Sequence, residues 1–311
     1  MAAFITRRFG VILLTMACLT FIVFIFVNLE PRLRTLALEQ ANNRMSDREV
    51  SQWLDENGYK RPMVTRYVEW LGNAVTGDLG YSTRFRKPVS EVIGERLWYT
   101  AILMFWVMVV MVPAALIIGV LAGMKEGSTQ DRSLSVVSIV STSTPEYVSG
   151  ILFTVVFASW LGWFKGVAKA GDIDFWNFTL PVITIAIYGM GYIARMTRAS
   201  MAEVMSQQYI RTARLKGLSF YAVVVKHALR NALIAPFTVI MLQFPWLLTG
   251  VVIVEAIFNY KGFGWTLIQA ADNNDISLLL ACSLVSVLIV LATQLISDIG
   301  YVFLNPRIRV A

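Results

Sequence analysis

Residues 98–123 read WYTAILMFWVMVVMVPAALIIGVLAG and contain no charged side chain. A transmembrane helix needs about 20 mostly apolar residues, so this stretch is long enough to cross a bilayer. Five further stretches qualify by the same criterion. They are residues 9–27, 133–164, 180–197, 232–257 and 276–304. The sequence therefore predicts an all-α membrane protein with six transmembrane helices.

The composition agrees with this class. Hydrophobic residues make up 57% of the 311 residues and charged residues only 15%, whereas soluble domains average about 45–50% and about 25%. The mean hydropathy of +0.62 has the same sign. This excludes a disordered chain and argues against a soluble enzyme. The net charge of +7 is explained by basic loops beside membrane lipid, so we expect no nucleic-acid partner.

The residues that usually carry chemistry are scarce. His227 is the single histidine, and Cys18 and Cys282 both lie inside apolar stretches. No Gly-Lys dipeptide occurs, which excludes the phosphate-binding Walker A loop. We therefore expect no catalytic residues, no metal and no cofactor. If the protein works with ATP, another subunit must bind it.

Lysine and arginine in short loops set the orientation of a membrane protein. With a cytoplasmic N-terminus, thirteen of these residues lie inside and three lie in short outer loops. The long segment 28–97 is then periplasmic, and the tail 305–311 is cytoplasmic. Residues 1–27 are either a retained membrane anchor or a cleaved signal peptide. The anchor is favoured because no small-x-small cleavage site follows.

The outer segment 28–97 carries helix signals. Ser46 and Glu49 have the spacing of a capping box, Gly58 suits the end of that helix, and Pro62 suits the first turn of the next. This second helix carries four apolar residues at helical spacing. They are Val64, Tyr67, Leu71 and Val75. The segment is either a small cap packed on the spans or a docking surface for an external partner, and the pattern favours the cap.

Three small residues lie at the end of the second predicted span. Gly119, Gly123 and Gly127 recur every four residues, which predicts close helix packing.

An acidic residue, Glu146, follows Pro145 inside the third predicted span. A carboxylate at that depth either lines a substrate path or is bonded to a nearby hydroxyl, such as that of Ser141 or Thr144.

Glu255 lies near the outer end of the fifth span. It is a second candidate for the path, although a polar anchor at a helix end or between helices is the favoured explanation.

The cytoplasmic loop 202–230 is strongly basic. The sequence predicts a short helix over residues 209–216 that ends at Gly217. Ser219 is expected to cap the next helix, and Pro236 is expected to kink the chain where it enters the membrane. Ala213 and Gly217 lie four residues apart, so we expect one bare helix face that a partner can approach closely. The competing explanation is a basic helix that binds anionic lipid.

The run YIRTARLKGLS at 209–219, followed by VVKHALRNALIAP at 224–236, resembles the cytoplasmic "EAA" loop of ABC-transporter permeases, in particular the dipeptide/oligopeptide-type importers of bacteria. Residues 61–82, 143–147, 254–264 and 305–309 are also similar to this family. The sequence departs from the family at residues 29–31, at Lys261, and at residues 211–213, where Arg-Thr-Ala replaces Glu-Ala-Ala.

The resemblance implies the type I ABC importer permease fold, with residues 98–304 as its core. Its coupling helix would dock on an ATPase through Tyr209, Arg211, Ala213, Arg214 and Gly217. Implied partners are a second homologous permease, two ATP-binding subunits and a periplasmic or lipid-anchored solute-binding protein. Transport would proceed by alternating access in the bacterial inner membrane.

The transported solute is open at this point. Peptides are typical of this family, and opines, nickel chelates, glutathione and oligosaccharides are alternatives. A membrane enzyme, a stand-alone channel and a lipid-binding scaffold are competing classes of function.

Overall fold

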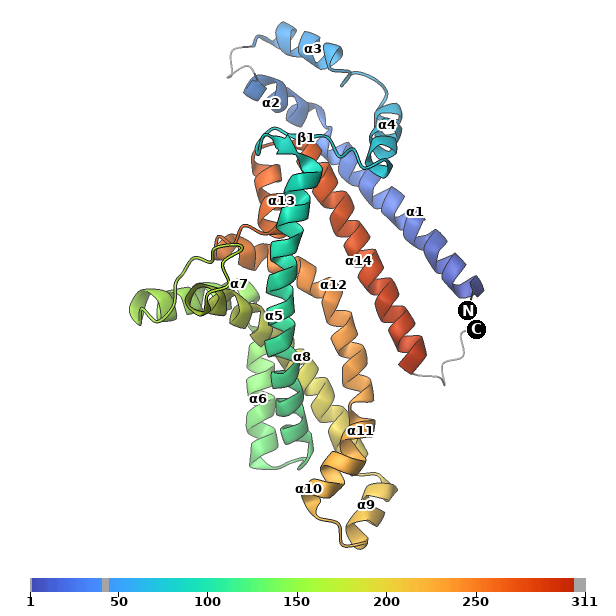
Figure 1. Cartoon of the computed structure of the whole chain (residues 1–311), viewed down its shortest axis with the longest axis vertical. Helices are drawn as coiled ribbons and strands as arrows, with labels where there is room; N and C mark the ends of the chain where they lie inside the picture. The colour runs from blue at the N-terminus through green and yellow to red at the C-terminus, as the bar shows by residue number, and fades with distance from the viewer. Residues whose placement is uncertain (1, 41–44, 305–311) are drawn as a thin grey trace. The chain divides into compact units, whose positions relative to one another are not determined.

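The computed structural model describes residues 2–40 and 45–304, and the predicted tail 305–311 lies outside this part of the chain. The described residues form helices and one short hairpin, joined by loops (Figure 1). The chain divides into two compact units. The first unit comprises residues 1–99 and 262–292, and the second comprises residues 100–261 and 293–311. Helices α5 (Val89–Gly123) and α14 (Ile276–Leu304) contribute residues to both units.

The first unit contains the N-terminal helix, the outer segment and two C-terminal helices. Its remaining elements are α1 (Ala2–Val27), α2 (Glu30–Gln40), α3 (Asp47–Glu56), α4 (Met63–Val75), β1 (Tyr81–Ser82), β2 (Lys87–Pro88) and α13 (Phe263–Asp272). The two strands are antiparallel, with Tyr81 paired to Pro88.

The helix signals of the outer segment are confirmed at α3. The Ser46 backbone N–H donates to Glu49 Oε2 at 2.7 Å, and the Glu49 N–H donates to Ser46 Oγ, which completes the capping box. Gly58 follows the helix with φ of 72°, a left-handed conformation that favours glycine. Pro62 precedes α4 as its cap residue, one position before the predicted one.

The apolar stripe predicted on α4 is only partly buried. Tyr67 is buried, whereas Val64 and Val75 are exposed. Tyr67 packs with Phe24 and Val27 of α1 and with Leu280 of α14, and its hydroxyl lies 2.8 Å from Thr20 Oγ1. Tyr67 is therefore the buried centre of the contact between α4 and α1.

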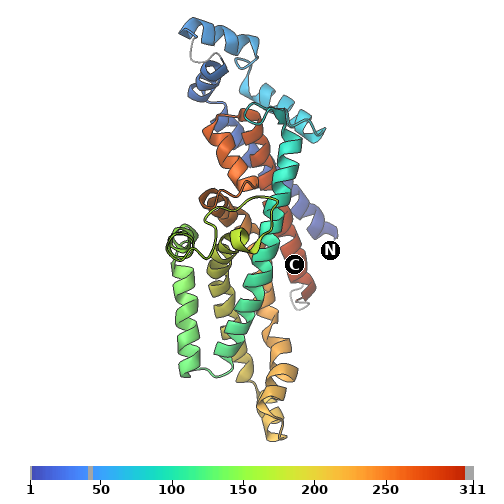
Figure 2. The same ribbon diagram turned by 60° about the vertical axis from the view of Figure 1, so that its left-hand side comes forward.

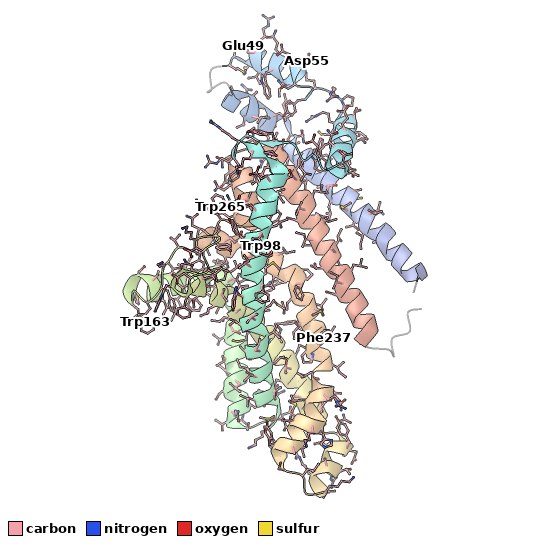
Figure 3. The ribbon with its side chains drawn as sticks, in the orientation of Figure 1. Glu49, Asp55, Trp98, Trp163, Phe237 and Trp265 are labelled. Carbon is pink, nitrogen blue, oxygen red and sulfur yellow. The ribbon has the colours of Figure 1, made fainter. Side chains whose placement is uncertain are left out.

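The second unit contains the rest of α5 and a series of helices that continue to α12. They are α6 (Thr129–Ser143), α7 (Glu146–Phe153), η1 (Thr154–Trp160), α8 (Phe175–Met205), α9 (Gln208–Leu215), α10 (Phe220–Ala222), η2 (Val223–Ala228), α11 (Leu229–Ala232) and α12 (Ile234–Ile257). Figures 1 and 2 show α6 lying alongside α8, with which it is in extensive contact. Trp163, in the loop after η1, is exposed (Figure 3).

Close packing at the small residues of α5 is confirmed for two of the three glycines. A Cβ atom at Gly119 would lie 2.5 Å from the carbonyl oxygen of Ala194, and one at Gly123 would lie 2.6 Å from that of Arg198. Both acceptor residues belong to α8, so α5 and α8 approach at backbone distance. Gly127 instead forms a turn with φ of 77° and open space around it.

The prediction of six continuous spans is not confirmed. In the described part of the chain, four helices are long and apolar enough to cross a membrane, or five if one bent pair counts as a span. The four are Gly10–Val27, Val89–Gly123, Phe175–Met205 and Ile276–Ser297, and the bent pair is Phe220–Ala232 with Ile234–Leu248.

The prediction of one continuous helix over residues 133–164 is wrong. Thr144 adopts an extended conformation with ψ of 115°, so α6 ends at Ser143 and α7 begins at Glu146. The cause is Pro145, because a proline disfavours helical geometry in the residue before it.

The fifth predicted span bends by 49° at Leu233, earlier than expected. Pro236 lies in the first turn of α12 and has no N–H to donate to the carbonyl of Ala232. The hydroxyl of Ser200 donates to that carbonyl instead, at 2.8 Å. Pro236 therefore breaks the helix by removing one backbone hydrogen bond.

Candidate coupling site and translocation path

The short helix predicted in the cytoplasmic loop is present as α9 (Figure 1). It ends at Leu215, and Gly217 follows in the left-handed conformation with φ of 77°. Ser219 then caps the next helix, since its Oγ accepts from the Ala222 N–H at 3.3 Å. All three local predictions for this loop are confirmed.

The helix α9 is seated on an apolar cluster through its inner face. Ile210 is fully buried and Ala213 is 6% exposed. Both pack against Met201 of α8 and Val223 and Val224 of η2. The prediction that Ala213 shares an exposed face with Gly217 is therefore wrong: Ala213 is small because the loop packs tightly beneath it.

The outer face of this loop is basic and partly apolar. Tyr209, Arg211, Arg214 and Gly217 are all exposed, and a Cβ atom on Gly217 would meet nothing within 4 Å. Leu215 is 81% exposed and Tyr221 is 76% exposed. Exposed apolar side chains beside an uncovered glycine are typical of a protein–protein contact surface.

Two interactions hold α9 in place from its ends, and a third fixes the Phe220 ring of α10 on which one of them rests. Tyr209 Oη accepts a hydrogen bond from Asn231 Nδ2 at 2.9 Å. The guanidinium carbon of Arg214 lies 5.8 Å from the centre of the Phe220 ring, and Lys125 Nζ lies 5.7 Å from the same ring. Displacement of α9 would therefore act on η2 and α11, which lead into α12.

An ion pair between a half-buried arginine and a buried aspartate joins α8 to α6. Asp131, in the first turn of α6, is buried and accepts from Arg198 Nη2 at 2.7 Å. It also accepts from the Gly127 N–H at 2.9 Å and from Ser135 Oγ at 3.2 Å. The bonds from Arg198 hold the pKa of the Asp131 carboxyl well below its usual range.

The sequence predicted Glu146 midway along a continuous span. The structure instead places Glu146 at the start of α7. Its side chain is half-buried and has no hydrogen-bond partner among the described residues. The hydroxyls expected to bond it are engaged elsewhere: Ser141 donates to the Ser138 carbonyl at 3.0 Å and Thr144 to the Val140 carbonyl at 3.0 Å. The hydroxyl-bonded explanation of Glu146 is therefore wrong.

Glu255 is fully buried in α12. Its Oε1 accepts a hydrogen bond from Thr100 Oγ1 of α5 at 2.5 Å. This geometry is that of a polar anchor between two helices, and it differs from the half-buried position of Glu146.

Two features of the site were not anticipated from the sequence. The Asp131–Arg198 pair joins residues far apart in the chain, and no local spacing signals it. The sequence analysis did not single out Leu215 and Tyr221, although a leucine and a tyrosine flanking a basic loop glycine could have indicated a contact surface.

Comparison with known proteins identifies the family to which this sequence is similar. Residues 115–310 match the family model of the binding-protein-dependent transport system inner membrane component. The oligopeptide transport system permease protein AppB of Bacillus subtilis (strain 168) is 32% identical over 317 residues, which cover 99% of this chain and 100% of that protein. The glutathione transport system permease protein GsiC of Escherichia coli O6:H1 is 33% identical over 316 residues, with 99% of each chain covered.

Solved structures share the fold at low sequence identity. An amino acid ABC transporter crystallised with histidines has a TM-score of 0.54 at 17% identity and covers 68% of this chain and 94% of that one. The MetNI methionine ABC transporter, in an inward-facing conformation, has a TM-score of 0.50 at 17% identity with the same coverage. The chain therefore belongs to the family of binding-protein-dependent transport system inner membrane components, and it is a multi-pass permease subunit of an ABC importer in the inner membrane.

Proposed function

We propose that this permease carries peptides or related small solutes and that α9 with Gly217 couples it to ATP-binding subunits. The observation that carries the coupling role is the contrast between the two faces of α9. Its inner face is fixed on a buried apolar cluster, and its outer face presents Arg211, Arg214 and Leu215. A helix attached in this way transmits a push because it cannot move independently of its neighbours.

The remaining subunits follow from the architecture of an importer. The chain supplies one half of the path, so a second homologous permease supplies the other half. Two ATP-binding subunits drive closure, and a periplasmic or lipid-anchored solute-binding protein delivers the solute. The relatives named for oligopeptides and for glutathione support a peptide-like solute. Opines, nickel chelates and oligosaccharides are the alternative solutes.

Glu146 is proposed to line the path. It is half-buried, and it begins α7 after the break at Pro145. No described side chain forms a hydrogen bond with its carboxylate. Glu255 is the weaker path candidate because its carboxylate already holds α5 to α12.

The subunit composition is tested by purification of the tagged chain from its native membrane. We expect a second permease and ATP-binding subunits to accompany it, and ATP hydrolysis to depend on them. ATP hydrolysis by the chain alone would contradict the proposal.

The orientation is tested with a cysteine at Asn73, an exposed residue of α4. Cys18 is exposed and is replaced by serine in the background, whereas Cys282 is buried. We expect an impermeant thiol reagent to label position 73 from the periplasmic side. Labelling only from the cytoplasmic side would reverse the topology.

A further inference from the structure

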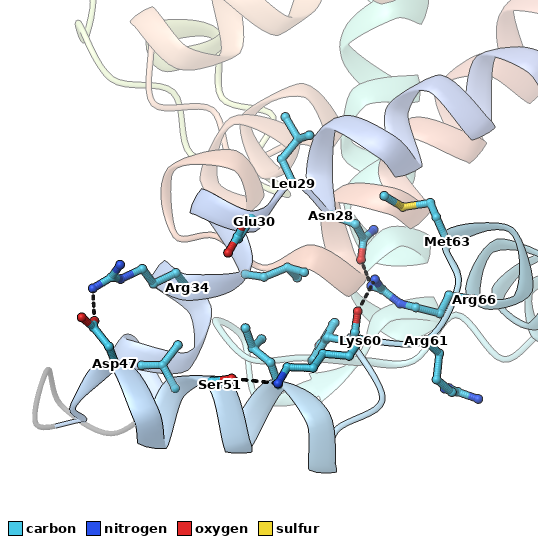
Figure 4. A pocket seen from close by; sticks show the side chains of 14 residues that line it. Asn28, Leu29, Glu30, Arg34, Asp47, Ser51, Lys60, Arg61, Met63 and Arg66 are labelled. Atoms are coloured by element: carbon cyan, nitrogen blue, oxygen red, sulfur yellow. Dashed lines mark hydrogen bonds and ion pairs between the residues drawn. The ribbon is translucent and has the colours of Figure 1, made fainter.

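The outer segment contains a cleft that the coupling mechanism does not use. A cavity of about 570 Å³ lies between α2, α3 and the start of α4 (Figure 4). A second hollow of about 250 Å³ shares four lining residues with it. These shared residues are Asn28, Tyr59, Arg61 and Arg66. We call the two hollows together the Arg66 cleft, and its volume is within the range of small-molecule sites.

Two cations of the cleft are already neutralised. Arg34 forms an ion pair with Asp47, as Figure 4 shows. Arg61 Nη1 lies 2.9 Å from Glu69 Oε1. Their charges are therefore satisfied without a ligand.

The other two cations bond only neutral groups among the described residues. Arg66 Nη1 donates to the Tyr59 carbonyl at 2.9 Å, and Nη2 donates to Asn28 Oδ1 (Figure 4). Lys60 Nζ donates to Ser51 Oγ at 2.7 Å. A guanidinium has five N–H donors, so Arg66 retains donor capacity for an anion.

The surroundings of Arg66 strengthen its attraction for an anion. Its guanidinium carbon lies 5.0 Å from the centre of the Tyr59 ring and 5.7 Å from that of Phe24. Burial lowers the pKa of Arg66, yet the group stays charged at neutral pH. Because the low dielectric of such a site weakens screening, an uncompensated charge there interacts more strongly than on the surface.

Trp70 carries a further donor beside the second hollow. Trp70 lines it, and its indole Nε1 is buried with no hydrogen-bond partner in the described structure. Buried polar groups of native proteins are normally hydrogen-bonded. An acceptor atom supplied by a ligand or by water would satisfy this N–H.

The charge of the lining limits the ligand. The four cations face three carboxylates, which are Glu30, Asp47 and Glu69, so one positive charge is left uncompensated. A singly charged anion balances it. Leu33 and Val50 are buried and Leu54 and Met63 complete an apolar wall, so the ligand also needs an apolar body.

We propose that the Arg66 cleft binds a small monocarboxylate with an apolar body, whose carboxylate is held by Arg66 and Lys60. The probe is N-acetylphenylalanine, with the neutral N-acetylphenylalaninamide as its isosteric control. Binding to the purified full chain in detergent is measured by equilibrium dialysis at pH 7. We expect the acid to bind at least tenfold more tightly than the amide.

Variants locate the binding at the cleft. Arg66→Gln is expected to weaken binding of the acid at least tenfold and Lys60→Gln about threefold. The matched control is the double variant Arg34→Gln with Asp47→Asn, which removes an ion pair of the same cavity without changing its net charge, and it should change binding less than twofold. Trp70→Phe keeps the ring and removes the N–H, so a loss of several fold is expected.

Arg66 also ties α4 to its neighbours, so circular dichroism accompanies each variant. If Arg66→Gln loses helix content, Lys60→Gln and Trp70→Phe decide the question. Equal binding of acid and amide would overturn the proposal, and so would equal losses in Lys60→Gln and in the double variant Arg34→Gln with Asp47→Asn. Displacement of the acid by an equal concentration of inorganic phosphate would reduce the cleft to a general anion site and would also overturn it.

Discussion

Arg198 donates two hydrogen bonds to Asp131, from Nε to Oδ1 at 3.0 Å and from Nη2 to Oδ2 at 2.7 Å. Arg198 belongs to α8, which leads to α9, and Asp131 lies in the first turn of α6. The Gly127 N–H, in the turn after α5, donates to the same carboxylate. One buried carboxylate therefore joins α6, α8 and the turn after α5, and Arg198 is close in the chain to the proposed coupling loop.

Asp131→Asn is expected to destabilise the protein. The amide keeps one acceptor but cannot neutralise Arg198, and a hydrogen bond to a charged group contributes about 1.5–3 kcal/mol. Thermal unfolding of the purified chain measures this loss. The matched control is Glu126→Gln: Glu126 also pairs with Arg198, at 3.3 Å, but it is exposed, and we expect less than about 1 kcal/mol. Equal effects of the two substitutions would show that burial of the pair is unimportant.

The same pair predicts a pH dependence. The pKa of Asp131 is lower in the folded protein than in the unfolded chain, where it is about 3.9. Its contribution to stability is therefore complete above that unfolded value and is lost as the pH falls towards the folded pKa. The difference in melting temperature between wild type and Asp131→Asn should be constant from pH 5 to 8 and shrink below about pH 4. A difference that shrinks already between pH 7 and 5 would assign the effect to another group.

Gly119→Val is expected to weaken the packing of α5 on α8. The space for a side chain is occupied by Ala194 and Thr197, and inserted bulk in a packed interface costs about 1–3 kcal/mol. Gly72→Ala in α4 is the control, because a Cβ atom there meets nothing within 4 Å. It should be neutral or stabilising by up to about 1 kcal/mol, since alanine favours a helix over glycine. A stable Gly119→Val variant would disprove the close approach of the two helices.

Glu146 and Glu255 are expected to respond differently to the same change. Glu146→Gln should alter solute transport in reconstituted vesicles while leaving thermal stability and basal ATP hydrolysis nearly unchanged. Glu255→Gln should lower the melting temperature, because it replaces one carboxylate oxygen by an NH2 donor in a fully buried site that already bonds Thr100. Normal transport by Glu146→Gln would exclude that residue from the path.

Local features of this fold could be predicted from the sequence because they depend on neighbouring residues. The capping box at Ser46 and Glu49, the helix end at Gly217 and the cap at Ser219 are each decided within a few positions, and each is present. The apolar stretch 98–123 was likewise sufficient to predict a spanning helix.

Features that depend on tertiary contacts were beyond local patterns. The break in the stretch 133–164 is a different case, because it follows from the adjacent residues Thr144 and Pro145, and the apolar length of the stretch concealed it. Ala213 looks like an accessible small residue until the cluster beneath α9 is known. The Arg66 cleft brings α1, the α3–α4 loop and α4 together, and no spacing in the sequence indicates that Arg66 lacks a carboxylate.

The central claim is that the outer face of α9 and Gly217 transmit force from ATP-binding subunits. Gly217→Asp is expected to insert and fold, because a Cβ atom there meets nothing and the left-handed backbone costs about 1–2 kcal/mol. Gly162→Asp is the matched control, since Gly162 has φ of 62° and equally open surroundings but lies in the loop after η1. Arg211→Glu with Arg214→Glu tests the competing explanation, in which the loop binds anionic lipid.

The most direct measurement is recovery of ATP-binding subunits with the tagged chain, together with solute-stimulated ATP hydrolysis, in these variants. The account predicts that Gly217→Asp loses both by more than tenfold, that Gly162→Asp keeps both, and that the double charge reversal has the smaller effect. Intact recovery and stimulation in Gly217→Asp, or a loss confined to the double charge reversal, would contradict it.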